Sequence, residues 1–195
     1  MNESFWVLIS DITQPIEWKT IFSEQKEIHI DLGAGDGGFA IGLAQKNPQW
    51  NVLAVERLKG RAQKIVRKAK QQNLKNLRVL RLESSYFLTY LVPTSSVSMI
   101  HVMHPDPWPK RKQHKNRLFQ KNFIESCLRV LIPGGKLRFT SDHPSYFIKV
   151  LKIVKEFHGL HMEDWNHKFN YPKSDFEKRF SFEEKIVMQQ VWKKI

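Results

Sequence analysis

The chain has 195 residues, of which 41% are hydrophobic and 26% charged, a balance typical of a folded protein and not of an extended disordered one. This length suits one domain, and we expect a single domain over residues 1–195 in which residues 1–25 form an N-terminal extension. The formal net charge of +13 indicates a polyanionic partner, either a nucleic acid or an anionic membrane surface.

Several other classes are excluded by the distribution of apolar residues and cysteine. No run approaches the roughly 20 apolar residues that cross a bilayer, and the N-terminus lacks the basic lead and apolar length of a secretory signal. The single cysteine, Cys127, lies in an apolar helical pattern, which predicts a buried thiol and excludes an intrachain disulfide. We therefore expect a soluble, cytoplasmic protein, monomeric or homodimeric, with no membrane partner.

Strand and helix patterns alternate along the chain. Apolar and β-branched runs predict strands at residues 27–32, 51–56, 77–82, 97–102 and 136–140. Helical periodicity predicts helices at residues 39–48, 58–73, 115–131 and 146–157, and residues 185–192 carry a weaker strand pattern. Such alternation is typical of an α/β protein with a parallel sheet covered by helices on both faces, whose ligands bind beyond the carboxyl ends of the strands.

A glycine-rich loop follows the first predicted strand. Gly33, Gly35 and Gly38 fit the G-x-G-x-x-G spacing, in which glycines let the backbone turn tightly and approach a bound cofactor. With Glu56 at the end of the second strand, the same spacing also fits a nicotinamide-dependent dehydrogenase, which binds ribose through an acid at that place. The loop alone therefore leaves a methyltransferase, a dehydrogenase and a turn without any cofactor open.

Acidic residues stand at the carboxyl ends of three strands. Asp31 can contact the cationic methionine end of S-adenosyl-L-methionine, Glu56 can accept hydrogen bonds from the ribose hydroxyls, and Glu83 can meet the adenine amine. Each acid by itself can also be a solvated strand end. Their convergence on one sheet edge, in a chain without room for a second substrate domain, favours S-adenosyl-L-methionine over a dinucleotide.

The most specific segment is Pro105-Asp106-Pro107-Trp108-Pro109, directly after the fourth strand. The prolines fix φ and so lower the entropic cost of presenting Asp106 and Trp108. Trp108 either stacks on a base or packs in the core. The basic run that follows can contact phosphates, although such a run is also typical of a solvated surface. The candidate phosphate contacts are Lys110, Arg111, Lys112, Lys115 and Arg117, with Lys59, Arg61, Lys64, Arg67 and Lys68 of the second helix.

Four segments together resemble the bacterial tRNA (guanine-N7-)-methyltransferase family. They are Asp31-Leu32-Gly33-Ala34-Gly35-Asp36-Gly37-Gly38-Phe39, Pro105-Asp106-Pro107-Trp108-Pro109-Lys110, Thr140-Ser141-Asp142 and Ser174-Asp175-Phe176-Glu177. Their order and spacing match over about residues 15–192. The proline-aspartate-proline-tryptophan segment is specific to that family, whereas many methyltransferases share the glycine loop.

The resemblance implies a Rossmann-like class I methyltransferase with a mostly parallel seven-stranded sheet. It implies methyl transfer from S-adenosyl-L-methionine to N7 of a guanine in the tRNA variable loop. The implied cofactor positions are Asp31, Glu56, Glu83 and Asp106, together with Gly33 and Gly35 of the loop, and the implied substrate positions are Lys110, Asp142, Ser174 and Glu177. Three positions depart from the family's more common residues. Asp31 stands where glutamate is common, Glu83 where aspartate or asparagine is common, and Ser174 where threonine is common, and each keeps the hydrogen-bonding type.

Asp106 is the predicted catalytic residue. Guanine N7 has a free in-plane lone pair, so methylation requires alignment and no general base. We expect Asp106 to orient the guanine through its N1–H and amino edge and to stabilise the cation, with Asp142 or Glu177 assisting.

Two other functions, and a metal site, fit parts of the same sequence. An RNA-binding protein that kept the fold but lost activity is the main alternative, followed by a small nicotinamide-dependent oxidoreductase. His101, His104 and His114 lie near Asp106 in the sequence, but their spacing matches no zinc pattern and methyl transfer needs no metal. We therefore expect no metal.

Overall fold

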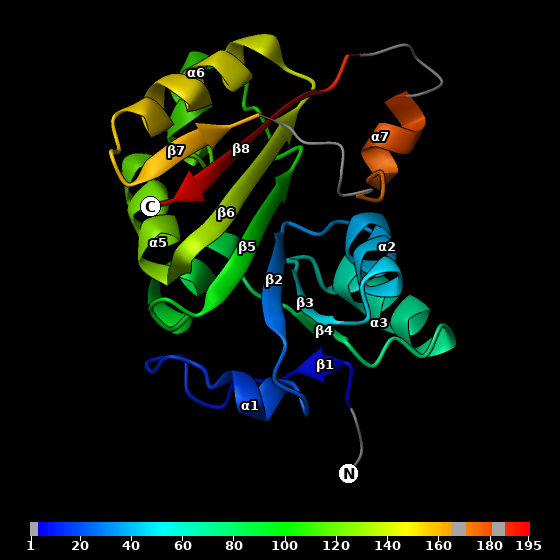
Figure 1. Cartoon of the computed structure of the whole chain (residues 1–195). Helices are drawn as coiled ribbons and strands as arrows, with labels where there is room; N and C mark the ends of the chain where they lie inside the picture. The colour runs from blue at the N-terminus through cyan, green and yellow to red at the C-terminus, as the bar shows by residue number, and fades with distance from the viewer. Residues whose placement is uncertain (1–3, 165–170, 181–185) are drawn as a thin grey trace.

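The computed structural model describes residues 4–164, 171–180 and 186–195, which build one eight-stranded sheet (Figure 1). The strand order is β1-β4-β3-β2-β5-β6-β8-β7. The strands are β1 Trp6–Val7, β2 Glu27–Leu32, β3 Trp50–Val55, β4 Leu77–Leu80, β5 Val97–Met103, β6 Leu131–Ser141, β7 Leu160–Glu163 and β8 Met188–Lys194. β1 to β6 pair in parallel, whereas β8 is antiparallel to both β6 and β7.

Helices cover both faces of this sheet, as the sequence predicts. The α-helices are α1 Trp18–Ile21, α2 Gly38–Lys46, α3 Lys59–Gln71, α4 Ser84–Tyr86, α5 Lys121–Val130, α6 Pro144–Lys155 and α7 Asp175–Phe180. A π-helical turn, η1 (Phe87–Leu91), and a 3-10 helix, η2 (Arg111–Asn116), complete the described elements. In Figure 1, α2 and α3 lie together beside β2, β3 and β4, away from α5 and α6. No helix within the described residues is both long enough and apolar enough to cross a membrane.

Two apolar cores form on the two faces, and the alternation of side chains along β2 assigns its residues to them. Ile28, Ile30 and Leu32 join the core beneath η1, α5 and α6. The intervening residues His29 and Asp31 therefore point to the opposite face, where α2 and α3 pack. The acid that the sequence places at the end of the first strand thus faces the helix that follows the glycine loop.

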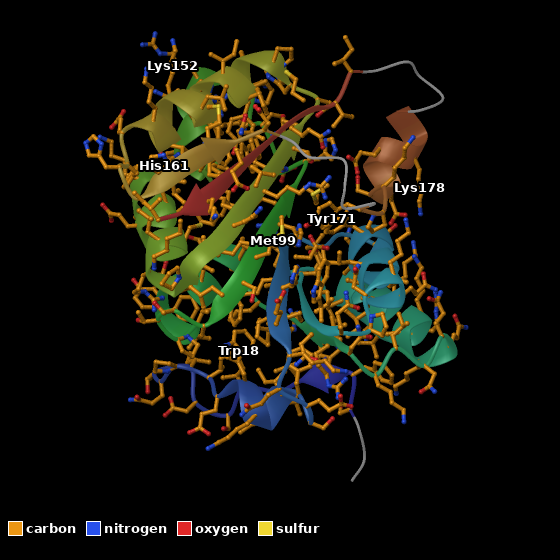
Figure 2. The ribbon with its side chains drawn as sticks, in the orientation of Figure 1. Trp18, Met99, Lys152, His161, Tyr171 and Lys178 are labelled. Carbon is orange, nitrogen blue, oxygen red and sulfur yellow. The ribbon has the colours of Figure 1, made fainter. Side chains whose placement is uncertain are left out.

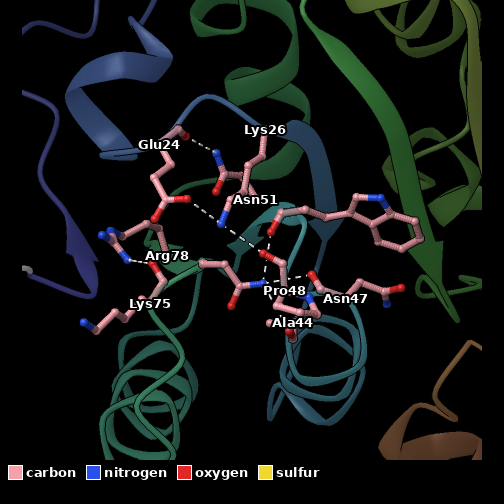
Figure 3. Close-up of polar contacts among 10 residues, drawn as sticks. Glu24, Lys26, Ala44, Asn47, Pro48, Asn51, Lys75 and Arg78 are labelled. Atoms are coloured by element: carbon pink, nitrogen blue, oxygen red, sulfur yellow. Dashed lines mark hydrogen bonds and ion pairs between the residues drawn. The ribbon is translucent and has the colours of Figure 1, made fainter.

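A polar network fixes the loops at the amino ends of the strands (Figure 3). The side-chain amide of Asn76 donates to the backbone carbonyls of Ala44, Asn47 and Trp50. Arg78 is buried and donates to the carbonyls of Ile21, Lys75 and Leu77. These bonds stabilise the amino ends of the strands, because they supply donors to backbone carbonyls that would be costly to bury without a hydrogen bond.

Several element boundaries differ from the prediction; β6, for example, begins at Leu131 and not at residue 136. The helix predicted from residue 115 begins only at Lys121, because the backbone is extended at Arg117 (ψ 138°) and at Gln120 (ψ 168°). Within the described part of the chain the sheet has eight strands and not seven, since β1, in the segment treated as an extension, pairs with β4. The tail strand β8 begins at Met188, and Lys185, where the predicted strand begins, lies outside the described residues.

Candidate cofactor and substrate site

The glycine loop connects β2 to α2 and has an open side. Gly33 and Gly35 adopt positive φ values of +75° and +58°, which favour glycine. Apart from the adjacent residues in the chain, no described atom lies within 4 Å of the point where a Cβ would project from either residue. A ligand can therefore approach the backbone of this loop closely.

Glu56 follows β3 and holds the loop through its buried carboxylate. Its Oε2 accepts a hydrogen bond from the Gly35 N–H at 2.9 Å, and its Oε1 accepts one from the Leu58 N–H at 2.8 Å. A carboxylate has about four acceptor sites, so two remain for the paired hydroxyls of a ribose. Glu56 thus lies beside the loop, and the structure adds a role that the sequence does not predict, the ordering of the loop itself.

Asp31 presents a buried carboxylate that other described residues do not satisfy. The residue is 1% exposed, and neither carboxylate oxygen has a hydrogen-bond partner among the described residues. Burial raises the pKa of Asp31 to about 7, an effect opposed by the Arg138 guanidinium and reinforced by Glu56. An unpaired buried carboxylate is costly, so this residue fits the cationic group of a ligand.

Arg138, on β6, lies on the same face of the sheet between aromatic rings. Its guanidinium lies 5.4 Å from the Phe39 ring centroid and 4.7 Å from that of Tyr171. Burial lowers the pKa of Arg138 to about 10, while Glu177, Tyr171 and Asp31 oppose that shift. Arg138 therefore remains cationic and electrostatically connects the Asp31 side of the site to Glu177. Sequence reasoning missed this residue.

His29 and His101 complete the polar part of this sheet face. His29 Nδ1 and His101 Nε2 are 3.2 Å apart, and His29 stacks on Trp50 with ring centroids 4.0 Å apart. Burial lowers the pKa of His29 to about 3 and that of His101 well below its ordinary value, so both rings are neutral. Among the described residues, no group of three or more metal-ligating side chains is placed to hold a metal ion.

The segment after β5 presents Asp106 at the surface on a braced loop. Arg117 is buried and donates through Nε to the Pro107 carbonyl at 2.7 Å and through Nη2 to the Trp108 carbonyl at 3.3 Å. Its guanidinium also lies 4.8 Å from the Tyr146 ring centroid. The prediction that Arg117 contacts a phosphate is therefore wrong, because its guanidinium is used to hold the loop that carries Asp106.

Two cations of α3 contact the glycine loop. Lys64 pairs with the Asp36 carboxylate at 2.8 Å, and Lys68 donates to the Asp36 carbonyl at 3.0 Å. The Lys64 hydrogen bond lowers the pKa of Asp36. These two lysines attach α3 to the glycine loop, and the phosphate contacts proposed for them stay a prediction. The remaining candidates are exposed: Lys59, Arg61, Arg67, Lys110, Arg111, Lys112 and Lys115.

Glu83 lies at the carboxyl end of β4 and caps the next helix. Its two carboxylate oxygens accept hydrogen bonds from the N–H groups of Ser85 and Tyr86, at 2.9 and 2.7 Å. This is the side-chain arrangement of a helix N-cap. The residue is exposed, and its remaining lone pairs face solvent or a ligand.

The predicted substrate residues Ser174 and Glu177 form a reciprocal cap at the start of α7. The Glu177 carboxylate accepts from the Ser174 N–H at 2.6 Å, and the Ser174 hydroxyl accepts from the Glu177 N–H at 3.1 Å. Asp142 lies 3.8 Å from the His104 imidazole. Burial lowers the pKa of His104, and the charges of Glu177 and Asp142 oppose that effect, so both carboxylates act electrostatically on this ring.

The chain is similar to known methyltransferases in sequence and in fold. The family described as "Putative methyltransferase" matches residues 25–192. The solved structure of an antibiotic related methyltransferase superposes with a TM-score of 0.69 at 14% identity, covering 99% of this chain and 98% of that one. The fold is that of a Rossmann-like class I methyltransferase, as the resemblance implies.

Two relatives show which family of methyltransferases the chain belongs to. A tRNA (guanine-N(7)-)-methyltransferase of Chlamydia muridarum is 31% identical over 177 residues, covering 89% of this chain and 79% of the relative. Another, of Syntrophotalea carbinolica, is 30% identical over 159 residues, covering 82% and 68%. The chain belongs to the tRNA (guanine-N(7)-)-methyltransferase family.

Proposed function

We propose that the protein transfers a methyl group from S-adenosyl-L-methionine to N7 of a guanine in the variable loop of tRNA. The observation that carries the proposal is the fully buried Asp31 carboxylate, whose oxygens lack partners among the described residues, beside an open glycine loop. Membership of the family supplies the substrate class.

The residues of the loop and strand ends fit S-adenosyl-L-methionine. Asp31 binds the ammonium of the methionine moiety, and Glu56 accepts hydrogen bonds from the ribose hydroxyls. Gly33 and Gly35 allow close approach of the backbone, and Glu83 meets the adenine amine with a remaining lone pair. When bound, this cofactor supplies an electrophilic methyl group on a sulfonium.

Asp106 positions the guanine, and the reaction requires no proton transfer to this carboxylate. Its exposed carboxylate accepts hydrogen bonds from N1–H and the amino group of the base, while the loop is held by Arg117. The N7 lone pair then points to the methyl group, and alignment of this kind is worth up to roughly 7–11 kcal/mol in favourable cases. Asp142 and Glu177 assist on the substrate side, and Lys110 contacts a phosphate.

The molecular surface suits the same substrate. The exposed cations that flank the Asp106 loop and line α3 contact the tRNA backbone, in keeping with the net charge of +13. A tRNA substrate places the reaction in the cytoplasm. We assign residues 1–195 to one catalytic domain, because the described strands share a single sheet.

The experiment is methyl transfer from labelled S-adenosyl-L-methionine to unmodified tRNA, followed by chemical cleavage at N7-methylguanine. Wild-type protein should place the label at a variable-loop guanine, and Asp106→Ala should lose most of its turnover with both substrates saturating. Label at an exocyclic amine, or cofactor binding without any transfer, would contradict the proposal. The second of these results would indicate an RNA-binding protein that kept the fold without the activity.

A further inference from the structure

The segment Tyr171–Glu177, which carries Ser174 and Glu177, packs directly on α2. The Gly38 N–H donates to Asp175 Oδ2 at 3.1 Å, and a Cβ on Gly38 would overlap the Asp175 carboxylate. A Cβ on Gly42 would lie 2.7 Å from Pro172 Cβ. Residues four apart share a face of a helix, so these two glycines form one shallow surface that receives the segment.

The other end of the segment is attached to the sheet. The Tyr171 hydroxyl donates to Met99 Sδ at 3.1 Å, and its ring lies 4.7 Å from the Arg138 guanidinium carbon. Figure 2 shows Tyr171 next to Met99, and Figure 1 shows α7 beside α2. The Tyr171–Glu177 segment therefore runs from the polar face of the sheet to the amino end of α2.

The contact at Gly38 supplies a cap that α2 lacks locally. The N-cap residue is Gly37, which has no side chain to bond the free N–H groups of the first turn. Asp175, 137 residues away in sequence, provides the carboxylate, and the positive end of the helix dipole favours its charge. One carboxylate thus joins the helix of the cofactor loop to the helix that Ser174 and Glu177 start.

We propose that Asp175 is a positioning residue that fixes the tRNA-binding side chains Ser174 and Glu177 relative to the cofactor loop. This proposal rests on the proposed function, because it takes Ser174 and Glu177 as tRNA contacts. Since the two binding sites share this contact, cofactor and tRNA bind cooperatively, and the coupling passes through the Gly38–Asp175 hydrogen bond.

The test compares Asp175→Ala with Asp175→Asn, which keeps an acceptor oxygen, and with Gly42→Ala, which displaces Pro172 without changing charge. Glu125→Ala is the control, because it removes an exposed acid from α5, which packs on the opposite face of the sheet. The Kd of tRNA is measured with and without S-adenosylhomocysteine, along with the Kd of S-adenosylhomocysteine alone and amide hydrogen exchange across residues 171–177.

Asp175→Ala and Gly42→Ala should speed exchange in the segment and weaken tRNA binding about fivefold when S-adenosylhomocysteine is present. The Kd of S-adenosylhomocysteine alone should change less than about twofold, and Asp175→Asn should restore most of the tRNA affinity. Unchanged tRNA affinity in Asp175→Ala, or an equal loss in Glu125→Ala, would overturn the proposal. A wild-type protein that binds tRNA but transfers no methyl group would instead overturn the proposed function, and these dissociation constants would still decide the role of Asp175.

Discussion

Asp31 combines full burial with two carboxylate oxygens that have no hydrogen-bond partner among the described residues. Its pKa rises to about 7 in the folded chain from 3.8 for the free side chain. Between pH 3.8 and about pH 7, Asp31 keeps its proton in the folded state but releases it in the unfolded state. The contribution of Asp31 to folding stability is therefore fully present below pH 3.8 and is lost as the pH rises through about 7.

Cofactor binding should depend on this ionisation, because the ammonium of S-adenosyl-L-methionine pairs with the charged form of Asp31. We expect affinity to fall by up to about tenfold per pH unit below pH 7 and binding to release a proton there. Calorimetric titrations in two buffers of different ionisation enthalpy measure that proton. Asp31→Asn should bind weakly and without this pH dependence, and a wild-type affinity that is flat across pH 6–8 would refute the pairing.

Arg117 bears on the same site through the backbone that it holds. Arg117→Lys keeps the charge but loses the fork that bonds the Pro107 and Trp108 carbonyls. We expect this change to lower the free energy of unfolding by about 1–3 kcal/mol and to reduce turnover, as measured by urea denaturation and initial rates. Arg111→Lys, at an exposed position of η2, should change neither quantity. If Arg117→Lys kept the full free energy of unfolding, Arg117 would again be a candidate phosphate contact.

At the scale of elements, the periodicity of the sequence predicts the central strands and helices well. Buried runs such as Trp50–Val55 carry a strong local signal, because every side chain in a central parallel strand is covered. The predicted start of α5 is too early, since the Arg117 contacts with the preceding loop impose an extended backbone that local propensity does not contain. The strand β1 has only two residues, which is too short for an alternation pattern.

Part of the site can also be predicted from the sequence, because it lies at the ends of strands that the sequence predicts. Asp31 lies at the end of β2, and Glu56 and Asp106 follow β3 and β5. The carboxyl ends of parallel strands converge at one edge of the sheet, whatever the loops do. The cap formed by Ser174 and Glu177 is also readable from their spacing, because a serine three residues before a glutamate is a capping signature. Arg138 and Asp175 carry no such signal, since their partners lie far away in sequence and only the fold brings them together.

At the scale of the whole molecule, the net charge of +13 should appear as salt-dependent tRNA binding. Replacing Arg111, Lys112 and Lys115 with glutamine should reduce the slope of log affinity against log salt by about 0.7–0.9 for each phosphate that the variant no longer neutralises. The control replaces Lys149, Lys152 and Lys155 of α6, where Figure 2 shows Lys152 far from Tyr171 and Lys178. Equal slopes in the two triple variants would mean that the η2 cations are ordinary surface.

The nucleophile can be tested by changing one atom of the substrate. In a tRNA whose variable-loop guanine is replaced by 7-deazaguanine, a C–H group stands where N7 was, while the edge that Asp106 recognises is unchanged. The measurement is the initial rate of labelled methyl transfer to this tRNA and to the matched unmodified tRNA. We expect the two to bind with equal affinity and transfer to the deaza substrate to be abolished. Transfer to it at a comparable rate would contradict methylation at N7.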